Sequence, residues 1–246
     1  MWQHNTFLTL TYNDFHVPYG YVLDMDEITN FMRRMKYQEG PLRPRYFAAG
    51  EYGTKGTRIR NPHYHIIIFN YWPQDAVKHK EHGKYPTFTS ESVAKLWKGK
   101  GFHSLAPFSS EVANYVCKYI LKNQFLDESD AEYVPPFDPY TGEVVEIPKM
   151  RARMSTRPPI GKRYFDKYKD EIYKHDEIII EGKPRQPPKV FDKWMAEDQP
   201  DLLTRVKADR MANAQKYYEL QDSYTDRSHD TKSRRMARQQ REKGTL

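Results

Sequence analysis

Residues 61–70, NPHYHIIIFN, have the pattern of a β-strand with two chemically different faces. Residues two apart in a strand point to the same side, so His63 and His65 lie side by side. Tyr64 and Ile66 point the other way and are expected to face the core. Such a strand has to pack its apolar face against another layer while its histidine face stays accessible.

The histidine face gains a carboxylate from the preceding predicted strand, RPRYFAAGEYG, which ends near Glu51. The short span between Glu51 and His63 lets the two strands pair as a hairpin, which brings Glu51 within reach of His63 and His65. Two imidazoles and one carboxylate with open positions form a catalytic type of metal site, suited to Mn²⁺ or Mg²⁺, and zinc accepts the same ligands. The alternative is a pair of histidines on a half-exposed strand beside a surface carboxylate, with no metal.

A later segment, YVCKYILK, places Tyr115 and Tyr119 four residues apart on one face of a predicted helix. The two tyrosines border its apolar arc, and Lys118 and Lys122 lie just outside it. A neighbouring ammonium group favours tyrosinate and attracts phosphate, as a tyrosine nucleophile attacking a phosphodiester requires. The alternative is two border tyrosines beside two solvated lysines.

A second tyrosine pair, Tyr164 and Tyr168, has the same spacing but different neighbours. Asp166, Asp170 and Glu171 surround it, and these carboxylates would repel a phosphate. We therefore interpret this second pair as structural.

The charge of the chain indicates an anionic partner. The net charge is +7, and residues 227–246 contain seven Lys or Arg against two Asp or Glu. Such a tail is either solvated or a non-specific nucleic-acid contact. Lys55, Arg58 and Arg60, in the loop before His63, are further candidates for contacts to a DNA backbone.

The remaining composition limits the class of protein. Cys117 is the single cysteine, so an intramolecular disulfide and a cysteine-rich zinc site are excluded. No signal peptide and no apolar run of membrane-spanning length is present in the sequence. We therefore expect a soluble protein that is not secreted and does not contact a membrane.

The periodicity of the whole sequence predicts an α+β fold with an antiparallel sheet of about five strands and packed helices. Residues 1–175 are predicted to form the main domain, with an irregular insertion or hairpin at 126–150. Residues 176–246 are predicted to be a helical extension with a basic end. The expected strands cover residues 6–12, 43–53, 63–71, 102–108 and 149–156, and the expected helices cover 25–40, 90–101, 109–124 and 160–174, with a short strand at 176–182.

Four short motifs resemble those of HUH endonucleases, in the same order: FLTLTY, GEYG followed by PHYH, and YVCKYILK. The later stretch MSTRPPIG resembles the replication initiation proteins of microviruses of the gokushovirus type. The resemblance covers roughly residues 5–165. It implies an RRM-like antiparallel sheet, a divalent metal held by Glu51, His63 and His65, and a helix that brings Tyr115 and Tyr119 over the metal.

The resemblance also implies a function. A two-tyrosine enzyme of this class nicks and rejoins single-stranded DNA through a 5′-phosphotyrosine and leaves a 3′-hydroxyl that primes rolling-circle synthesis. The expected partners are the single-stranded phage origin and the host helicase and polymerase, in the cytoplasm of a bacterial host. The alternatives are a non-catalytic RRM-like nucleic-acid-binding protein, a transposase or relaxase of the same class, and a metal hydrolase that activates water without a covalent intermediate.

Overall fold

The computed structural model of the chain describes residues 4–40, 44–53, 61–82, 85–114, 117, 141–144 and 152–218. The chain divides into two compact units, an amino-terminal unit up to Ile160 and a carboxy-terminal unit from Gly161 onward. Among the helices in these ranges, none is long and apolar enough to cross a membrane.

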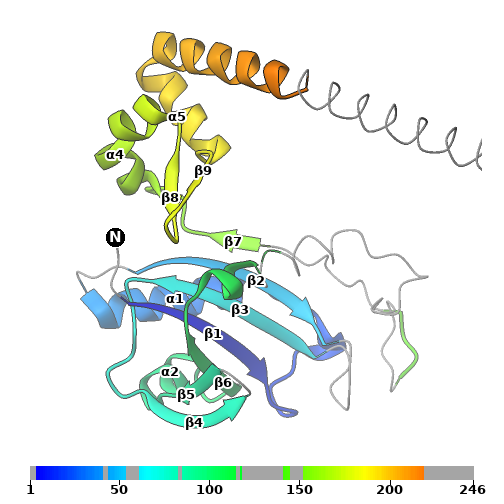
Figure 1. Cartoon of the computed structure of the whole chain (residues 1–246). Helices are drawn as coiled ribbons and strands as arrows, with labels where there is room; N and C mark the ends of the chain where they lie inside the picture. Colours follow the sequence, from blue (N-terminus) through cyan, green and yellow to red (C-terminus); the bar gives the residue numbers. More distant parts are fainter. Residues whose placement is uncertain are drawn as a thin grey trace, which may run out of the picture. The chain divides into compact units, whose positions relative to one another are not determined.

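The amino-terminal unit is built on a seven-stranded sheet with the order β4-β5-β6-β1-β3-β2-β7 (Figure 1). Each neighbouring pair of strands is antiparallel. The strands are β1 (Asn5–Tyr12), β2 (Arg45–Tyr52), β3 (Pro62–Phe69), β4 (Val77–His82), β5 (Tyr85–Thr89), β6 (Gly101–Pro107) and β7 (Ala152–Met154). The helices are η1 (Tyr19–Tyr21), α1 (Asp26–Glu39) and α2 (Glu91–Leu96). The predicted α+β class with an antiparallel sheet is confirmed.

Helices α1 and α2 cover one face of this sheet and form its core. The apolar stripe of α1, which includes Phe31 and Met35, packs against Leu8 and Ile66 of the central strands. Trp97, directly after α2, is fully buried in the same cluster. Alternation along β1 and β3 explains this arrangement, because every second side chain of each strand points to the helices.

The start of α1 agrees with the predicted cap. The Asp24 carboxylate accepts a hydrogen bond of 2.8 Å from the backbone amide of Asp26, the first residue of the helix. Gly40 ends the helix with a positive φ of 55°, a conformation that glycine adopts without strain. The helix therefore begins and ends where the sequence predicted.

The opposite face of the sheet carries a second, smaller apolar cluster. Ala49 and Ile67 are buried at its centre, and four half-buried phenylalanines pack against them, namely Phe7, Phe47, Phe69 and Phe108. This is the face on which the histidines of β3 lie, so their polar site borders an apolar and aromatic surface.

The β4–β5 hairpin was not predicted, and it raises the number of strands from about five to seven. The segment VKHKEHGKYPTFT was expected to be a polar loop, because it contains Pro86 and several charges and has no apolar alternation. Strand β4 is the outermost strand of the sheet on that side. Edge strands often carry charged residues and proline, which blunt aggregation and hide the strand from pattern-based prediction.

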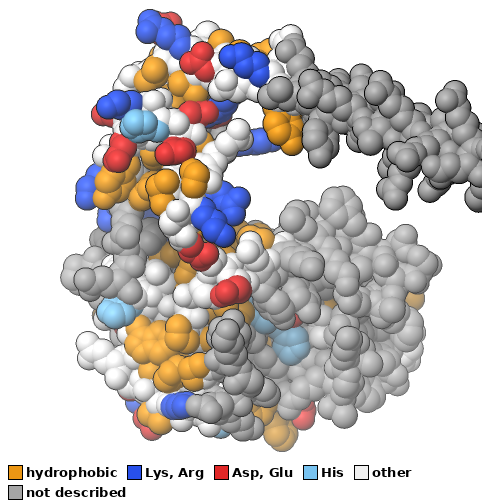
Figure 2. Space-filling model, in the orientation of Figure 1, with side chains coloured by type: hydrophobic (Ala, Val, Ile, Leu, Met, Phe, Trp, Pro, Cys, Tyr) orange, Lys and Arg blue, Asp and Glu red, His pale blue; other side chains and the backbone are white. Residues whose placement is uncertain are grey.

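The carboxy-terminal unit consists of α4 (Lys162–His175), the hairpin β8 (Ile178–Ile180) and β9 (Lys183–Arg185), α5 (Lys189–Asp198) and helical backbone over residues 200–218. Its core is formed by residues such as Phe165, Trp194 and Leu203, one from each helix. Basic and acidic side chains are interspersed over its visible surface (Figure 2).

A charged cluster fixes the helices of this unit to one another. Arg210 donates to both carboxylate oxygens of Asp176, at 2.6 and 2.8 Å, and to Asp192 at 2.6 Å. The Tyr173 hydroxyl donates to the other oxygen of Asp192 at 2.6 Å. The three helices are therefore tied at a single point outside their apolar core.

The structure places the division between the units after Ile160, whereas the sequence predicted a domain end at residue 175. The difference is α4, whose apolar stripe packs on α5 and the following helix in the core of the carboxy-terminal unit. Most of the predicted insertion at 126–150 and the whole basic tail at 227–246 lie outside the described residues.

Candidate functional site

His63 and His65 lie on the sheet face opposite α1, between strands β1 and β2. In the register of β1 and β3, Thr11 is paired with His63 and Thr9 with His65. On the other side, Glu51 of β2 is paired with His63. The predicted alternation of β3 and the predicted hairpin with Glu51 are both confirmed.

Glu51 contacts His65 directly. The distance between Glu51 Oε1 and His65 Nε2 is 2.9 Å, and the two side chains are only 15% and 10% exposed. Glu51 is directly opposite His63 and diagonal to His65, and a long side chain can reach a diagonal neighbour in an antiparallel pair. Because little water reaches these side chains, a charge at one of them is felt strongly by the other.

The other ring nitrogen of each histidine is held by a threonine of β1. Thr9 Oγ1 lies 3.1 Å from His65 Nδ1, and Thr11 Oγ1 lies 3.0 Å from His63 Nδ1. Two consecutive outward-facing threonines on β1 thus meet two consecutive outward-facing histidines on β3. With both Nδ1 atoms engaged, the Nε2 atoms are the ones presented to a ligand.

Two further contacts fix the position of this end of the sheet. The Phe7 ring stacks on the His65 imidazole, with 5.6 Å between centroids and 11° between planes. The buried Asn61 donates from its side-chain amide to the Tyr12 carbonyl oxygen at 3.2 Å, and its backbone carbonyl accepts from the Gly53 amide. Asn61 therefore joins the end of β1 to the turn region between β2 and β3.

The three predicted metal ligands are neighbours, but they do not surround a common point. Within the ranges described above, no three His, Cys, Asp or Glu side chains are grouped so that they could hold a metal ion. Glu51 is engaged with His65, and His63 is bonded to Thr11. The donor set is chemically suited to a divalent cation, and its two closest members are already in contact.

The predicted nucleophiles and phosphate contacts lie outside the described residues. These are Tyr115, Tyr119, Lys118 and Lys122 on the later helix, and Lys55, Arg58 and Arg60 in the loop before β3. The described backbone at 110–114 is helical, and the Ser109 hydroxyl accepts from the Val112 amide at 3.3 Å. A helix therefore begins where the one that carries these tyrosines was predicted to begin.

Two tyrosines on the helix side of the sheet are poorly suited to be nucleophiles. Burial, followed by the interaction with Tyr64, raises the pKa of Tyr12, and burial raises the pKa of Tyr64 as well. Their hydroxyls lie 3.3 Å apart, and Tyr64 donates to the Asp24 carbonyl oxygen at 2.8 Å. Both hydroxyls therefore stay protonated and have a structural role.

The second tyrosine pair lies in the carboxy-terminal unit. The rings of Tyr164 and Tyr168 are 4.8 Å apart and pack against the apolar core of that unit. This packing agrees with the structural interpretation of the pair.

Thr9, Thr11 and Phe7 were not identified from the sequence as site residues. The signal that could have found them is the alternation FLTLTY, which puts Phe7, Thr9 and Thr11 on one face of a strand. That signal becomes useful only once β1 is known to pair with β3 in this register.

The chain is similar to replication proteins of phages. The family model of the Replication-associated protein ORF2 family matches residues 5–124. "Replication-associated protein ORF2" of Spiroplasma virus 4 is 33% identical over 211 residues, which are 81% of this chain and 60% of that protein. "Replication-associated protein VP4" of Bdellovibrio phage phiMH2K is 27% identical over 245 residues, which are 92% of this chain and 70% of that protein.

The chain thus spans about 60% of the length of the first of these relatives. No solved structure matches it. The matched segment contains Glu51, His63, His65, Tyr115 and Tyr119, and the resemblance to phage replication proteins is confirmed. Over residues 5–124, the chain belongs to the Replication-associated protein ORF2 family.

Proposed function

We propose that this protein is a rolling-circle replication initiator that nicks and rejoins single-stranded DNA through a 5′-phosphotyrosine. The observation that carries the proposal is the contact of 2.9 Å between Glu51 Oε1 and His65 Nε2, with His63 next to both. The family match, to proteins named for replication, supports the same assignment.

The proposed cofactor is Mn²⁺ or Mg²⁺, held by Glu51 and by the Nε2 atoms of His63 and His65. Bound there, the cation would act as a Lewis acid on the scissile phosphate. To hold it, Glu51 must release His65, and each imidazole must carry its proton on Nδ1. The Thr9 and Thr11 hydroxyls suit this change, because a hydroxyl can either donate to Nδ1 or accept from it.

The proposed nucleophile is Tyr115 or Tyr119. Its phenolic oxygen forms a bond to phosphorus as the bond from phosphorus to the 3′ oxygen breaks. The proton that leaves the tyrosine is matched by the proton that the departing 3′-hydroxyl takes up. The reverse reaction rejoins the strand without an external energy source, because the phosphodiester has been exchanged for a phosphotyrosine ester.

Two tyrosines suit repeated nicking. While one tyrosine holds the 5′ end, the second can attack after one round of synthesis from the 3′-hydroxyl. Lys118 and Lys122, with Lys55, Arg58 and Arg60, are the proposed contacts to phosphates of the origin strand. Host helicase and polymerase are the proposed partners that act on the nicked origin, in the cytoplasm of the host.

The test is a covalent-adduct assay. The full chain is incubated with labelled single-stranded oligonucleotides and Mn²⁺, and the products are separated on a denaturing gel. We expect a protein–DNA band that disappears when Tyr115 and Tyr119 are both changed to Phe, and that persists in part in each single variant. The matched control changes Tyr164 and Tyr168 to Phe, which removes two hydroxyls at the same spacing and should leave the band unchanged.

A second arm tests the metal ligands. His63→Ala and His65→Ala are expected to abolish the adduct and to weaken Mn²⁺ binding measured by calorimetry, while the circular dichroism spectrum stays that of the folded protein. Cleavage without any covalent band would instead indicate a hydrolase that activates water. DNA binding with neither cleavage nor metal binding would indicate a non-catalytic nucleic-acid-binding protein.

A further inference from the structure

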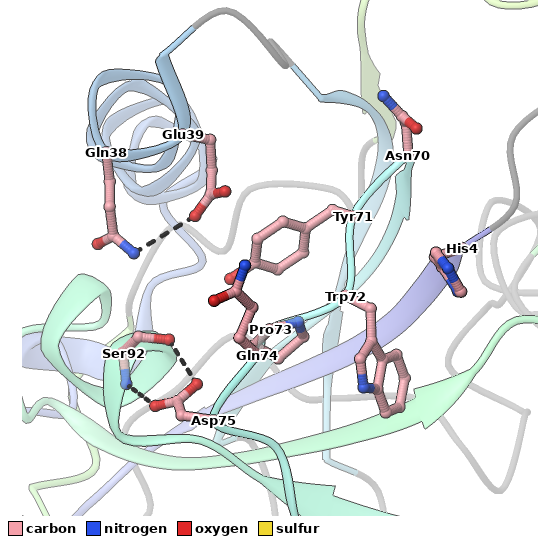
Figure 3. Close-up of a pocket in the computed structure, with 10 residues that line it drawn as sticks. All are labelled: His4, Gln38, Glu39, Asn70, Tyr71, Trp72, Pro73, Gln74, Asp75 and Ser92. Atoms are coloured by element: carbon pink, nitrogen blue, oxygen red, sulfur yellow. Dashed lines mark hydrogen bonds between the residues drawn. The ribbon is translucent and has the colours of Figure 1, made fainter.

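A cavity of about 610 Å³ opens at the other end of the sheet from Glu51 (Figure 3). It lies where α1 ends, where the chain leaves β3 and where α2 begins. Its volume is in the range of cavities that hold small molecules or parts of larger ones. At about 3.3 Å per residue along the strand, Tyr71 at the cavity is roughly 20 Å from His65.

The segment that lines this cavity is held firmly by β1. The Thr6 hydroxyl donates to the Tyr71 carbonyl oxygen at 2.6 Å, and the Tyr71 amide donates to the His4 carbonyl oxygen at 3.1 Å. The Asn70 amide donates to the side-chain oxygen of Asn5 at 3.1 Å. The walls are therefore ordered before any ligand enters, which lowers the entropic cost of binding.

The opposite wall is ordered by Asp75 at the start of α2. Its carboxylate accepts from the Ser90 hydroxyl at 2.7 Å, and from the amide and the hydroxyl of Ser92 at 2.8 and 2.9 Å. These hydrogen bonds outweigh burial and lower the pKa of Asp75, so its charge is fixed. Asp75 thus has its partners, and the recognition groups have to come from other residues.

The Tyr71 hydroxyl is the strongest indication of a ligand. Tyr71 is only 5% exposed, lines the cavity and has no hydrogen-bond partner of normal geometry for its hydroxyl among the described residues. Its ring projects towards Glu39 and Gln74 in Figure 3. The nearby Ser92 hydroxyl donates to Asp75 instead. A buried hydroxyl left without a partner is costly.

The protonation state of this hydroxyl is set by its surroundings. Burial, and then the charge of Glu39, raises the pKa of Tyr71 to about 12, although the nearby Ser92 opposes the shift. The hydroxyl is therefore a neutral donor at physiological pH, and a ligand with an acceptor atom would satisfy it.

The remaining lining is that of a site for a flat, neutral and polar group. Gln38, Asn70 and Gln74 supply primary amides, Glu39 supplies a carboxylate, and no lysine or arginine is among the described lining residues. A phosphate would be repelled, whereas an exocyclic amino group would be accepted by the carboxylate. Amides and carboxylates are the groups that pair with the amino-bearing edges of adenine and cytosine.

The aromatic end of the cavity can stack on a base. Trp72 is half-buried and packs edge-to-face on Phe88, with 5.2 Å between ring centroids. Its ring points away from Tyr71 and lies near His4 in Figure 3. Stacking on such rings is the usual way in which proteins hold bases of single-stranded DNA.

We infer that this cavity binds an amino-bearing nucleobase of the single-stranded DNA, with Glu39, Tyr71 and Gln74 reading its polar edge and Trp72 stacking nearby. The inference rests on the proposed function for its source of bases. It gives the protein a base-discriminating contact at a distance from the proposed nicking centre, with thymine the disfavoured base.

The experiment measures binding alone, in EDTA, so that nicking takes no part. Labelled oligo-dA, oligo-dC and oligo-dT of equal length are titrated with the full chain by fluorescence anisotropy. We expect oligo-dC and oligo-dA to bind about tenfold more tightly than oligo-dT. Glu39→Gln should remove most of this ratio while leaving the affinity for oligo-dT unchanged.

Two variants and two controls complete the experiment. Tyr71→Phe should weaken oligo-dC and oligo-dA binding about fivefold, and Trp72→Leu should weaken all three about tenfold. Tyr46→Phe removes a hydroxyl from another buried tyrosine, and Glu91→Gln removes a carboxylate from the surface of α2. Neither control should change any affinity, and melting temperatures confirm that each variant is folded.

The outcomes separate the two hypotheses. Tight binding of all three oligonucleotides with no base preference, or variants that behave as wild type, would overturn this inference and leave the proposed function standing. Failure of the wild type to bind any oligonucleotide would overturn both. Free deoxycytidine or deoxyadenosine that binds as tightly as the oligonucleotides would overturn DNA as the source of the base.

Discussion

Thr9 and His65 face each other across neighbouring strands, with 3.1 Å between Thr9 Oγ1 and His65 Nδ1. The threonine fixes the ring that contacts Glu51, so it acts on the proposed metal site through the histidine. We predict that Thr9→Val lowers Mn²⁺ affinity about tenfold, as is usual when the partner of a ligating histidine is removed.

The conservative variant separates positioning from packing. Thr9→Ser keeps the hydroxyl and should restore most of the Mn²⁺ affinity measured by calorimetry, whereas Thr204→Val in the carboxy-terminal unit should have no effect. Equal affinities of Thr9→Val and wild type would show that the hydroxyl does not support the site.

Gly101 lets β6 approach the same end of β1. A Cβ at this position would lie 2.1 Å from the Thr11 carbonyl oxygen and 2.5 Å from the Asn13 amide nitrogen, so the strands would have to separate. We predict that Gly101→Ala destabilises the amino-terminal unit by about 3 kcal/mol and weakens Mn²⁺ binding, because Thr11 moves with its strand.

Gly99→Ala provides the comparison for this prediction. A Cβ at Gly99 meets no atom within 4 Å, and its φ of +63° costs a side chain only about 1 kcal/mol of backbone strain. Urea unfolding of both variants measures the difference, and similar losses would contradict the steric explanation.

Lys118 and Lys122 can be tested by the salt dependence of DNA binding. If each contacts one phosphate, changing it to Gln should reduce the slope of log affinity against log salt concentration by about 0.7. Lys95→Gln on α2 removes an exposed lysine and should leave the slope unchanged. A lower affinity with an unchanged slope would mean that the lysines act on folding and not on phosphate.

Buried tyrosines make the amino-terminal unit sensitive to alkaline pH. The pKa of Tyr71 is about 12 in the folded protein, whereas a tyrosine in an unfolded chain has a pKa of about 10. The contribution of this difference is fully present below pH ~10 and is lost as the pH rises towards 12. Urea unfolding across this range should show a shallower loss for Tyr71→Phe than for wild type, and identical slopes would contradict the prediction.

Arg210 controls the stability of the carboxy-terminal unit. Burial raises the pKa of Asp192, but hydrogen bonds from Arg210 and Tyr173 outweigh burial and lower it overall. Arg210→Met leaves Asp176 and Asp192 without their cation and should destabilise the unit by about 2 kcal/mol. Hydrogen exchange of peptides from α4 and α5 in the full chain measures this loss.

The matched control for that prediction is Arg205→Met, which changes an exposed arginine in the same helical segment and should not alter exchange. Because the folded pKa of Asp192 is lowered, its contribution is present above pH ~4 and is lost in acid. Acid should therefore narrow the difference between Arg210→Met and wild type.

The sequence predicted the ligand face of the site well because that face depends on local rules. Alternation along β3 put His63 and His65 together, and the short connection to Glu51 fixed a hairpin. Thr9 and Thr11 were not predicted, because their role depends on pairing between segments more than fifty residues apart. Hydrophobic periodicity gives the face of a strand but not the identity of its neighbour.

The same limit explains the two errors in the fold. Strand β4 is polar because it lies at an edge, so it lacks the signal that revealed the central strands. Helix α4 was recognised as a helix, but its apolar stripe does not say which core it joins. The cavity beside Tyr71 was not predicted either, because three separate segments build it.

The site residues Glu51, His63 and Thr9 project from the same three strands that hold the core together on their other side. If β3 slipped by one residue against its neighbours, both histidines would turn towards the helices, and Tyr64 and Ile66 would turn outward. Such a slip would abolish the chemistry and the hydrophobic core at once. Variants that fold with this sheet register are therefore obliged to keep the site geometry, and natural selection for folding also preserves the arrangement of the proposed ligands.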